Sequence, residues 1–240
     1  MEKLYIVIPA YNEEENIEQV VRDWYPVVEG IGGESRLVVI DDGSKDSTWA
    51  KMQKLAEELP MFEPVTKQNQ GHGATVLYGY HYALKAGADY VFQTDSDGQT
   101  LPGEFGAFWE KRANYAMVIG HRKGRQDGLS RIFVTKTLKL VCRLCFHVTV
   151  TDANTPFRLM QARDLEENLK LVPENFNLSN VILSVIYAKK KQPVLYLPIT
   201  FRPRQGGVNS INLKKIFKIG KQAFRDFRTI NKCLKNEIKE

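Results

Sequence analysis

The sequence predicts an α/β protein in which a mostly parallel central sheet is flanked by helices and followed by a C-terminal amphipathic helix. Three observations lead to this prediction. Short apolar runs alternate along the chain with segments whose apolar residues recur at helical spacing. Polar turns follow the apolar runs, as they do where parallel strands end in loops. Residues 211–240 carry an apolar stripe with Lys and Arg mainly off it.

The first strand and helix are predicted from residue 4 to residue 24. Residues 4–8 are apolar and largely β-branched, and Pro9 ends the run, which is typical of a buried strand. Asn12 is the predicted N-cap of the helix, because three glutamates follow it where the helix dipole favours acids. Apolar residues then recur at helical spacing, at Ile17, Val20, Val21 and Trp24.

The same alternation predicts the rest of the domain. Further strands are predicted at residues 36–40, a weak one ending at 65, 89–94, 116–119, 156–160 and 194–201. Further helices are predicted at residues 47–58, 74–86, 102–112, 131–147 and 178–190. The glycine-rich stretch 70–73 is predicted to be a turn. Residues 1–210 are expected to form one domain, with the basic helix 211–240 as its appendage.

Composition indicates a soluble globular chain. Hydrophobic residues make up 43% of the 240 residues and charged residues 26%. No apolar run approaches the roughly 20 residues that span a bilayer. The N-terminus runs directly into strand-like sequence without the layout of a signal peptide. We therefore expect a cytoplasmic protein.

The three cysteines do not indicate a disulfide framework. Cys142 and Cys145 form a C-x-x-C pair, but there is no second pair to complete a zinc site. Their spacing places both on one face of a predicted helix within an apolar segment. We interpret them as small buried hydrophobic residues rather than as a metal or redox pair.

Positive charge is concentrated at the C-terminus. Of the net charge of +6, residues 202–240 contribute +8, from 11 Lys and Arg against 3 Asp and Glu. The predicted helix is either an ordinary packed helix with a solvated face or a membrane-surface helix, and we favour peripheral contact with anionic membrane. A nucleic-acid partner is not expected, because the basic segment lacks the interleaved aromatic residues of a stacking platform.

Asp95 and Asp97 directly follow the apolar run 90–93. If that run is a strand, alternation sends both side chains to the same side. Two converging carboxylates suit Mg²⁺ or Mn²⁺, which prefer carboxylates, water and substrate phosphates. The alternative is an ordinary acidic surface turn.

Two other polar segments follow predicted strands, at residues 9–13 and 41–44. In an open α/β sheet, ligands bind beyond the carboxyl ends of the strands, so these loops and the acidic pair are expected to line one crevice. Their chemistry suits a nucleotide diphosphate: a carboxylate accepts hydrogen bonds from a base or ribose, and a metal bridges two phosphates.

Seven motifs in collinear order resemble those of family 2 inverting glycosyltransferases, closest to the dolichyl-phosphate mannosyltransferase and polyprenyl-phosphate branch. They cover about residues 4–210 and lie at residues 9–13, 41–44, 69–74, 95–99, 120–122, 152 with 157–158, and 203–206. The resemblance implies a GT-A-like nucleotide-diphospho-sugar transferase fold, a UDP- or GDP-sugar donor and a divalent metal.

The resemblance also implies roles for single residues. Asp97 with Asp95 would hold the metal, and Gln99 would orient ligands or water. Asp41 and Asp42 would bind the base and ribose. Taken without the other motifs, residues 41–44 are interpreted as a simple turn with a helix cap. The donor site would also include Pro9, Tyr11, Glu13, Ser96 and Arg204.

Arginines and one later aspartate are candidates on the acceptor side. Arg122, Arg131 and Arg204 are candidates for phosphate contacts, because a guanidinium matches phosphate geometry. The alternative for each is a solvated surface arginine. Asp152 is the candidate for acceptor positioning or general base, and its alternative is a cap or turn residue.

Two departures from the branch concern the acceptor. Residues 208–210 lack the branch's lysine, and no acid occurs between Asn175 and Lys191. A lipid phosphate is already anionic near neutral pH, so it would need no base. The resemblance implies a polyprenyl-phosphate acceptor, and the missing acid is compatible with it. The alternatives are a transferase acting on a saccharide or cell-envelope glycan precursor, and a non-catalytic nucleotide-sugar-binding module.

Overall fold

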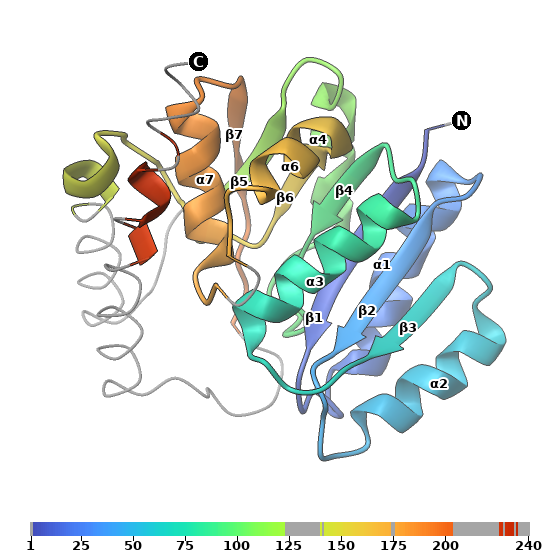
Figure 1. Cartoon of the computed structure of the whole chain (residues 1–240). Helices are drawn as coiled ribbons and strands as arrows, with labels where there is room; N and C mark the ends of the chain where they lie inside the picture. The colour runs from blue at the N-terminus through green and yellow to red at the C-terminus, as the bar shows by residue number, and fades with distance from the viewer. Residues whose placement is uncertain are drawn as a thin grey trace.

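A seven-stranded sheet forms the centre of the molecule. The computed structural model describes residues 2–122, 140, 142–173, 176–203, 226–227, 229–232 and 234. The strand order is β3-β2-β1-β4-β6-β5-β7 (Figure 1). The strands are β1 (Leu4–Ala10), β2 (Arg36–Asp41), β3 (Phe62–Thr66), β4 (Tyr90–Gln93), β5 (Met117–Arg122), β6 (Arg158–Gln161) and β7 (Val194–Ile199).

Helices cover both faces of this sheet. One face packs against α3 (His72–Lys85), α6 (Ala162–Leu169) and α7 (Ser179–Lys189), which Figure 1 shows on the viewer's side. The other face packs against α1 (Ile17–Ile31), α2 (Thr48–Glu58) and α4 (Phe105–Lys111), the last preceded by the 3₁₀ turn η1 (Pro102–Glu104). The predicted α/β sheet flanked by helices is confirmed.

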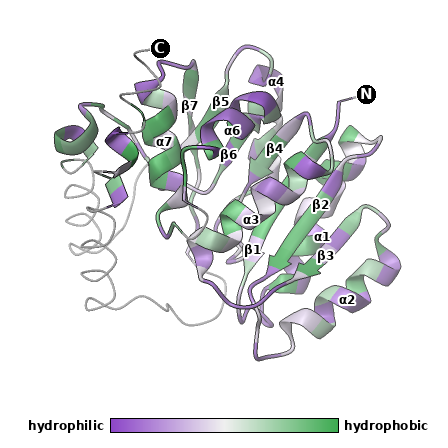
Figure 2. Cartoon of the chain, in the orientation of Figure 1, coloured by the Kyte–Doolittle hydropathy of each residue, from purple (hydrophilic) through white to green (hydrophobic). Residues whose placement is uncertain are grey.

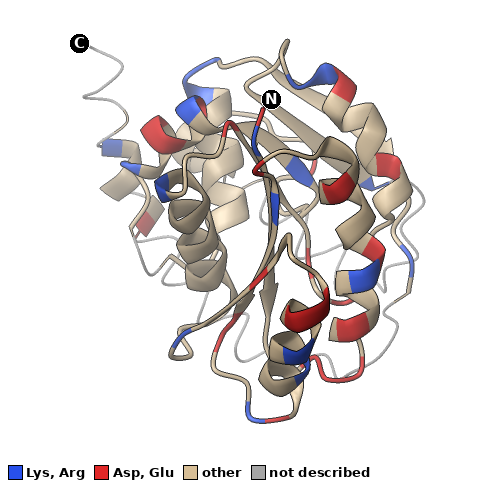
Figure 3. Ribbon diagram, turned by 90° about the vertical axis from the view of Figure 1, so that its right-hand side faces the viewer, with Lys and Arg blue, Asp and Glu red and all other residues tan. Residues whose placement is uncertain are grey.

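Each inner strand contributes to both hydrophobic cores because successive side chains point to opposite faces. In β1, Leu4, Ile6 and Ile8 belong to the core under α1, whereas Tyr5 and Val7 belong to the core under α3. Hydrophobic residues accordingly dominate the strands, and charged residues lie mainly on the surrounding helices and loops (Figures 2 and 3). This two-sided burial is why the strands are continuous apolar runs in the sequence.

The sheet is mostly parallel, as predicted. β1 pairs in parallel with β2 and β4, β2 with β3, and β5 with β7. β6 is antiparallel to both of its neighbours, β4 and β5. Phe157 immediately precedes this short strand and Arg158 is its first residue, so the predicted motif lies in the middle of the sheet.

Several predicted boundaries differ from the structure. The predicted cap at Asn12 is wrong, because α1 begins at Ile17 with Asn16 at its N-cap. Asn12 instead has a left-handed backbone, with φ of 53°, and its Oδ1 accepts from the Lys45 N–H at 2.9 Å. Helix α6 was not predicted. Gly120 to Arg122 lie within β5 rather than after it.

The close approach of α3 to β1 depends on Gly79. A Cβ there would overlap Val7 Cγ1 and would lie 3.3 Å from Ile40 Cγ1, both in the sheet. We expect Gly79→Ala to lower the free energy of unfolding by about 1–3 kcal/mol through overpacking, measured by urea unfolding. Gly30→Ala in α1 is the matched control. Its Cβ meets nothing within 4 Å, so the substitution should be neutral or stabilising by about 0.5–1 kcal/mol.

The described part of the C-terminus packs on the domain. Phe227, Ile230 and Leu234 are almost completely buried, and the Phe227 ring lies 5.2 Å from that of Phe146. This end of the predicted apolar stripe therefore faces the core. The remainder of the predicted helix 211–240, and most of the predicted helix 131–147, lie outside the described residues. Among the residues described, no helix is long and apolar enough to cross a membrane.

Cys142 and Cys145 are in a helical stretch that packs against the same core as the buried C-terminal residues. Cys142 is fully buried, and burial raises the pKa of its thiol to about 11. The Cys145 carbonyl accepts from Asn231 Nδ2 at 2.7 Å. The interpretation of Cys142 as a buried hydrophobic residue is confirmed; Cys145 is partly exposed.

Candidate active site at the carboxyl ends of the strands

The loops that follow β1 and β2 are joined by hydrogen bonds at one edge of the sheet. Ala10 and Asp41 are paired at the ends of the two strands, so both chains leave the sheet together. The Asn12 N–H donates to Ser44 Oγ at 2.9 Å, and the Glu13 N–H donates to Thr48 Oγ1 at 2.8 Å. The loop after the parallel strand β4 leaves the sheet at the same edge. The three loops therefore leave the sheet at one edge, and the expectation that they line one crevice stays a prediction.

Asp95 and Asp97 lie in the turn that follows β4. The strand ends at Gln93, so the expectation that strand alternation aligns the two carboxylates is wrong. The turn presents them instead: the Asp95 side chain is 28% exposed, and Asp97 Oδ1 accepts from the Gln99 N–H at 3.1 Å. Ser96, between them, is buried.

This turn fits a divalent cation only if other ligands complete the coordination. Within the described ranges, no three His, Cys, Asp or Glu side chains form a cluster that could hold a metal ion. Two partly exposed carboxylates are nevertheless the donor set that suits Mg²⁺ or Mn²⁺ bound together with substrate phosphates and water. Asp95 and Asp97 are thus the residues that would hold the ion.

His72 is a site residue that the sequence analysis left as a loop residue. It is the first residue of α3, and its Nε2 lies 3.1 Å from Asp95 Oδ1. Desolvation lowers the pKa of His72, but the nearby carboxylates of Asp95, Asp97 and Asp42 outweigh it, so the pKa lies above its ordinary value. The glycines on both sides of His72 were visible in the sequence; the contact with Asp95 was not.

Asp41 is buried and bonded within the chain. It is 1% exposed, and it accepts hydrogen bonds from the Ser44 N–H at 3.1 Å and from Thr66 Oγ1 at 2.7 Å. These contacts tie the end of β2 to its own loop and to the end of β3. The predicted contact of Asp41 with base or ribose stays a prediction.

Asp42 holds the loop after β3 in place. Its Oδ1 accepts from Lys67 Nζ at 2.5 Å and from the Gln70 N–H at 2.9 Å, and its Oδ2 accepts from the Gly71 N–H at 2.8 Å. Asp42 therefore fixes the turn from which His72 projects. Its predicted role at the ribose is likewise untested.

The Asp42 carboxylate is expected to stabilise the fold above about pH 4. Burial raises the pKa of Asp42, but Lys67 and the backbone N–H groups outweigh it and lower the pKa below the ordinary value of 3.8. A lowered pKa in the folded state means that the stabilisation is present above the unfolded-state pKa and is lost as pH falls through the folded-state pKa.

We expect Asp42→Asn to cost about 1–3 kcal/mol at pH 7, because its amide cannot accept all three hydrogen bonds. In urea unfolding from pH 7 to pH 3, the gap between wild type and variant should narrow below about pH 4. A gap that stays constant to pH 3 would contradict this account. Asp23→Asn, on the exposed face of α1, is the control and should change stability little at any pH.

Arg122 and Asp152 are brought together by the structure. Arg122 Nε donates to Asp152 Oδ2 at 2.9 Å, and Arg122 Nη2 donates to Oδ1 at 2.7 Å, a bidentate pair. Both side chains are less than 10% exposed, and the guanidinium lies 5.1 Å from the centre of the Phe201 ring. The predicted phosphate ligand and the predicted base thus contact each other. Arg131 and Arg204 lie outside the described residues.

Gln99 connects the acidic turn to the chain that leaves β7. Gln99 Nε2 donates to the Arg202 carbonyl at 2.7 Å, and the Arg202 N–H donates back to the Gln99 carbonyl at 2.9 Å. The turn is therefore coupled to the segment that runs toward Arg204. The predicted role of Gln99 in orienting metal ligands stays a prediction.

The predicted donor residues of the first loop differ in exposure. Pro9 is buried inside β1, opposite Ile40. Tyr11 is 40% exposed at the site. Glu13 is buried, and its Oε2 accepts from Asn16 Nδ2 at 2.8 Å. Of these three, Tyr11 alone presents a large exposed side chain to a ligand.

Arg158 holds backbone segments next to Asp152 in place. It is fully buried and donates to the carbonyls of Ala153, Thr155 and Asn180 at 2.6–3.1 Å. The first two carbonyls belong to the loop that begins at Asp152, and the third belongs to the first turn of α7. The sequence analysis identified Arg158 only as part of a motif.

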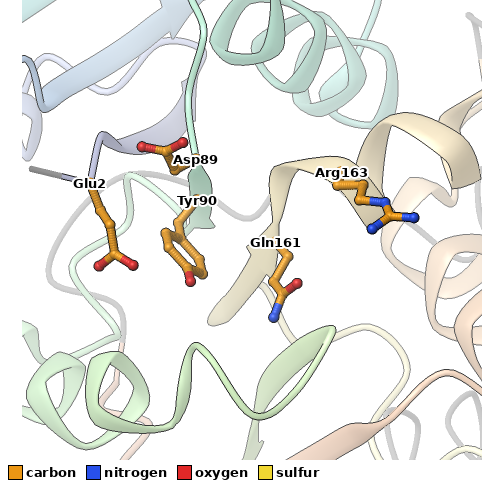
Figure 4. A pocket seen from close by; sticks show the side chains of 5 residues that line it. All are labelled: Glu2, Asp89, Tyr90, Gln161 and Arg163. Atoms are coloured by element: carbon orange, nitrogen blue, oxygen red, sulfur yellow. The ribbon is translucent and has the colours of Figure 1, made fainter.

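A hollow of about 510 Å³ lies at the opposite edge of the sheet. It is lined by Glu2, Asp89, Tyr90, Gln161 and Arg163, with the Tyr90 ring between Glu2 and Gln161 (Figure 4). Glu2 precedes β1, Asp89 and Tyr90 lie at the amino end of β4, and Gln161 and Arg163 lie at the carboxyl end of the antiparallel β6 and the start of α6, away from the acidic turn. The candidate site is thus the edge where the loops of β1, β2 and β4 meet.

The fold and these loops define the class: a GT-A-like fold of the kind that nucleotide-diphospho-sugar transferases use. The model of the family "Glycosyl transferase family 2" matches residues 5–176, and the chain belongs to this family.

Among curated relatives, dolichol-phosphate mannosyltransferase from Pyrococcus furiosus is 26% identical over 231 residues, which cover 93% of this chain and 63% of that protein. The undecaprenyl-phosphate 4-deoxy-4-formamido-L-arabinose transferase of Salmonella paratyphi B is 29% identical over 222 residues, covering 91% and 65%. The chain therefore spans slightly less than two thirds of the length of these relatives.

Solved structures with the same fold include glucosyl-3-phosphoglycerate synthase from Mycobacterium tuberculosis. Its complex with Mn²⁺, UDP-glucose and glycerol 3-phosphate matches with a TM-score of 0.66 at 18% identity, covering 95% of this chain and 80% of that one. At this identity the match supports the fold.

Proposed function

We propose that this protein is an inverting glycosyltransferase that moves a sugar from a nucleotide-diphospho-sugar to a polyprenyl phosphate with the help of Mg²⁺ or Mn²⁺. The observation that carries the proposal is the partly exposed Asp95–Asp97 turn at the carboxyl edge of the sheet. Membership of family 2 supports the transfer reaction. The two curated relatives are named for dolichol phosphate and undecaprenyl phosphate, and these names support a polyprenyl phosphate as the acceptor.

The acidic turn binds the donor in this mechanism. Asp95 and Asp97 would hold the cation, and the bound cation would supply charge neutralisation for the diphosphate leaving group. Tyr11 lies exposed in the first of the strand-end loops, where a base or sugar would lie. Asp41 and Asp42 tie the loop after β2 to the end of β3 and to the loop after β3 through their hydrogen bonds. In the donor complex they would also approach the base and ribose.

The acceptor supplies its own nucleophile. A phosphate oxygen attacks the anomeric carbon from the face opposite the nucleotide, the carbon–oxygen bond to the diphosphate breaks, and the nucleoside diphosphate leaves with the electron pair. No proton has to be removed from a lipid phosphate at neutral pH. This fits Asp152, whose carboxylate is already paired with Arg122 and is therefore poorly placed to act as a base.

We also propose that the protein is cytoplasmic and meets the membrane peripherally through its C-terminal Lys and Arg. The net charge of +8 in residues 202–240 supports attraction to anionic lipid. Because Phe227, Ile230 and Leu234 are buried in the domain, the contact would use charge rather than this part of the stripe. Changing Lys214, Lys215 and Lys218 to Gln should weaken binding to phosphatidylglycerol vesicles; unchanged binding would refute the contact.

A donor screen tests the proposed reaction. The purified protein is incubated with Mn²⁺ or Mg²⁺ and each common UDP-, GDP- or dTDP-sugar, with undecaprenyl phosphate, with a glycan acceptor, or with neither. Nucleotide release that requires the lipid phosphate supports the proposal. Nucleotide release that requires the glycan would indicate a glycan acceptor instead of a lipid phosphate. Asp152 would then be the first residue to test as the general base. Metal-dependent nucleotide binding without any turnover would indicate a non-catalytic binding module.

A further inference from the structure

Arg158, from the Phe157-Arg158 motif, is a buried cation that the proposed reaction does not use. It is the first residue of β6, which lies between β4 and β5, and its side chain is fully buried (Figure 1). Among the described residues, no Asp or Glu forms an ion pair with it; its contacts are carbonyl and hydroxyl oxygens. Burial of a charge without a carboxylate partner is costly, because the guanidinium loses its hydration. Packing alone therefore does not account for an arginine at this position.

The guanidinium of Arg158 joins two segments of the chain. Nε and Nη2 donate to the Thr155 carbonyl at 3.0 and 2.6 Å, and Nη2 also donates to the Ala153 carbonyl at 3.1 Å. Nη1 donates to the Asn180 carbonyl at 3.0 Å and contacts Ser184 Oγ at 3.4 Å. Ser184 Oγ in turn donates to the Ala153 carbonyl at 3.1 Å. Arg158 and Ser184 thus fasten residues 153–155 to α7.

The turn that Arg158 fastens begins at Asp152, the partner of Arg122. The Thr155 N–H donates to the Asp152 carbonyl at 3.3 Å, so residues 152–155 form one compact turn. The Asp152 carboxylate accepts from Arg122 Nε at 2.9 Å and from Arg122 Nη2 at 2.7 Å. The orientation of the Arg122 guanidinium therefore depends on how this turn is held.

The strands β5 and β6 attach the backbone of Arg122 to Arg158 as well. Arg158 is paired with Ile119 of β5, and the Gly120 N–H donates to the Phe157 carbonyl at 2.7 Å. Arg122 is the last residue of β5. Both the backbone of Arg122 and the turn that carries its carboxylate partner are thus connected to Arg158. The contacts form a closed ring in which Arg158 sets one end of the bidentate pair relative to the other.

We propose that Arg158 is a positioning residue for the acceptor: it holds Asp152 in the orientation that directs the Arg122 guanidinium at the acceptor phosphate. The inference rests on the proposed function, because it takes Arg122 to be the phosphate contact. Asp152 covers the Nε–Nη2 edge of Arg122, so the phosphate meets the guanidinium from its Nη1 side. A guanidinium binds phosphate through N–H groups of fixed direction, so a small rotation weakens the contact. Arg158 itself touches no substrate, because it is fully buried.

Steady-state kinetics of Arg158→Lys with undecaprenyl phosphate test this inference. Lysine keeps the charge, but its ammonium group cannot replace a planar fork that bridges two segments. We expect KM for the lipid phosphate to rise about 10-fold, because Arg122 is misplaced, and KM for the nucleotide-sugar donor to change less than about 2-fold.

Asn168→Ala is the matched control for loss of stability. Asn168 is also fully buried, and its Nδ2 donates to Gln192 Oε1 at 2.7 Å. Gln192 precedes the amino end of β7, whereas Arg122 ends the parallel strand β5, so this contact lies toward the opposite edge of the sheet. The variant should be destabilised but should keep the wild-type KM for the lipid phosphate.

A comparison of single and double variants separates positioning from a general loss of structure. If Arg158 acts through Arg122, adding Arg158→Lys to Arg122→Lys should raise KM for the lipid phosphate less than about 2-fold further. A general defect would raise this KM by the same factor in both backgrounds. Exchange of the Arg122 Nε–H with solvent, measured by ¹⁵N NMR and assigned by its absence in Arg122→Lys, is the readout without turnover. This proton should exchange faster in Arg158→Lys than in the wild type or Asn168→Ala.

Ser184→Ala loosens the same turn more gently and keeps the test decisive if Arg158→Lys does not fold. It removes the hydroxyl that contacts both Arg158 and the Ala153 carbonyl. We expect it to raise KM for the lipid phosphate about 3-fold, the effect of one lost hydrogen bond, without changing KM for the donor.

The outcomes distinguish this inference from the proposed function. If the wild type transfers sugar to the lipid and KM for the lipid phosphate is unchanged in both Arg158→Lys and Ser184→Ala, the positioning role is wrong and the transferase stands. The same conclusion holds if the Arg122 Nε–H exchanges faster but this KM does not change. If the wild type shows no lipid-dependent turnover with any donor, the proposed function is wrong, and the acceptor role of Arg158 is wrong with it.

Discussion

Replacing Asp97 with Asn is expected to lower sugar transfer about 10³-fold while changing the free energy of unfolding by less than about 0.5 kcal/mol. The Asp97 side chain is partly exposed in a turn, so its removal should disturb the fold little. What is lost is a charge that fixes the cation against the leaving group, where electrostatic stabilisation of the transition state is largest.

The measurement is the initial rate of nucleotide release with saturating donor and acceptor, paired with urea unfolding. Asp23→Asn on the surface of α1 is the matched control and should retain wild-type activity. If Asp97→Asn keeps more than a tenth of the wild-type rate, the acidic turn does not carry the chemistry. If the variant is instead strongly destabilised, the loss of rate reflects loss of the fold, and Asp97 acts structurally, for example through the Gln99 N–H.

The Arg122–Asp152 pair should produce the second large effect, this time on stability. Removing one member of a buried ion pair leaves an uncompensated charge and typically costs about 3–5 kcal/mol. Arg122→Met should therefore destabilise strongly, because the Asp152 side chain is only 7% exposed. The double variant Arg122→Met/Asp152→Asn should be less destabilised than the sum of the two single variants, because it leaves no buried charge unpaired.

A double-mutant cycle measured by urea unfolding checks this, with an expected coupling of about 2–3 kcal/mol. The pair Arg22–Glu58 is the control: it has similar chemistry at 2.9 Å, but both side chains are nearly half exposed. Its coupling should stay below about 1 kcal/mol. Equal couplings for the two pairs would mean that burial of Arg122 and Asp152 is not what makes their interaction strong.

Most of the sheet could be predicted from sequence because its strands are buried on both faces. Residues 4–8 and 36–40 are continuous apolar runs for that reason, and the parallel pairing of β1 with β2 follows from the helix between them. The meeting of the strand-end loops then follows from topology alone, without knowledge of any side-chain contact. The direction of β6 was not predictable in this way, because four residues carry no signal of direction.

The details of the site depend on contacts between distant parts of the chain. His72 and Asp95 are 23 residues apart and meet only because Asp42 and the chain before α7 fix the turn at Gly71. Arg122 and Asp152 were both recognised, but from separate motifs, and their pairing across 30 residues could not be read from either. Asn12 was predicted to be a helix cap because acidic residues follow it. In the structure it instead forms tertiary hydrogen bonds with Ser44 and Lys45 in the loop after β2.

The most direct test of the central claim is to follow the sugar itself. Wild type and Asp97→Asn are incubated with a radiolabelled form of the donor found in the screen, Mn²⁺ and undecaprenyl phosphate, and the lipid fraction is extracted. Labelled lipid from the wild type, absent with EDTA and reduced about 10³-fold in Asp97→Asn, is the result that we predict. Label that enters the lipid equally in Asp97→Asn or with EDTA would contradict metal-dependent transfer at the Asp95–Asp97 turn.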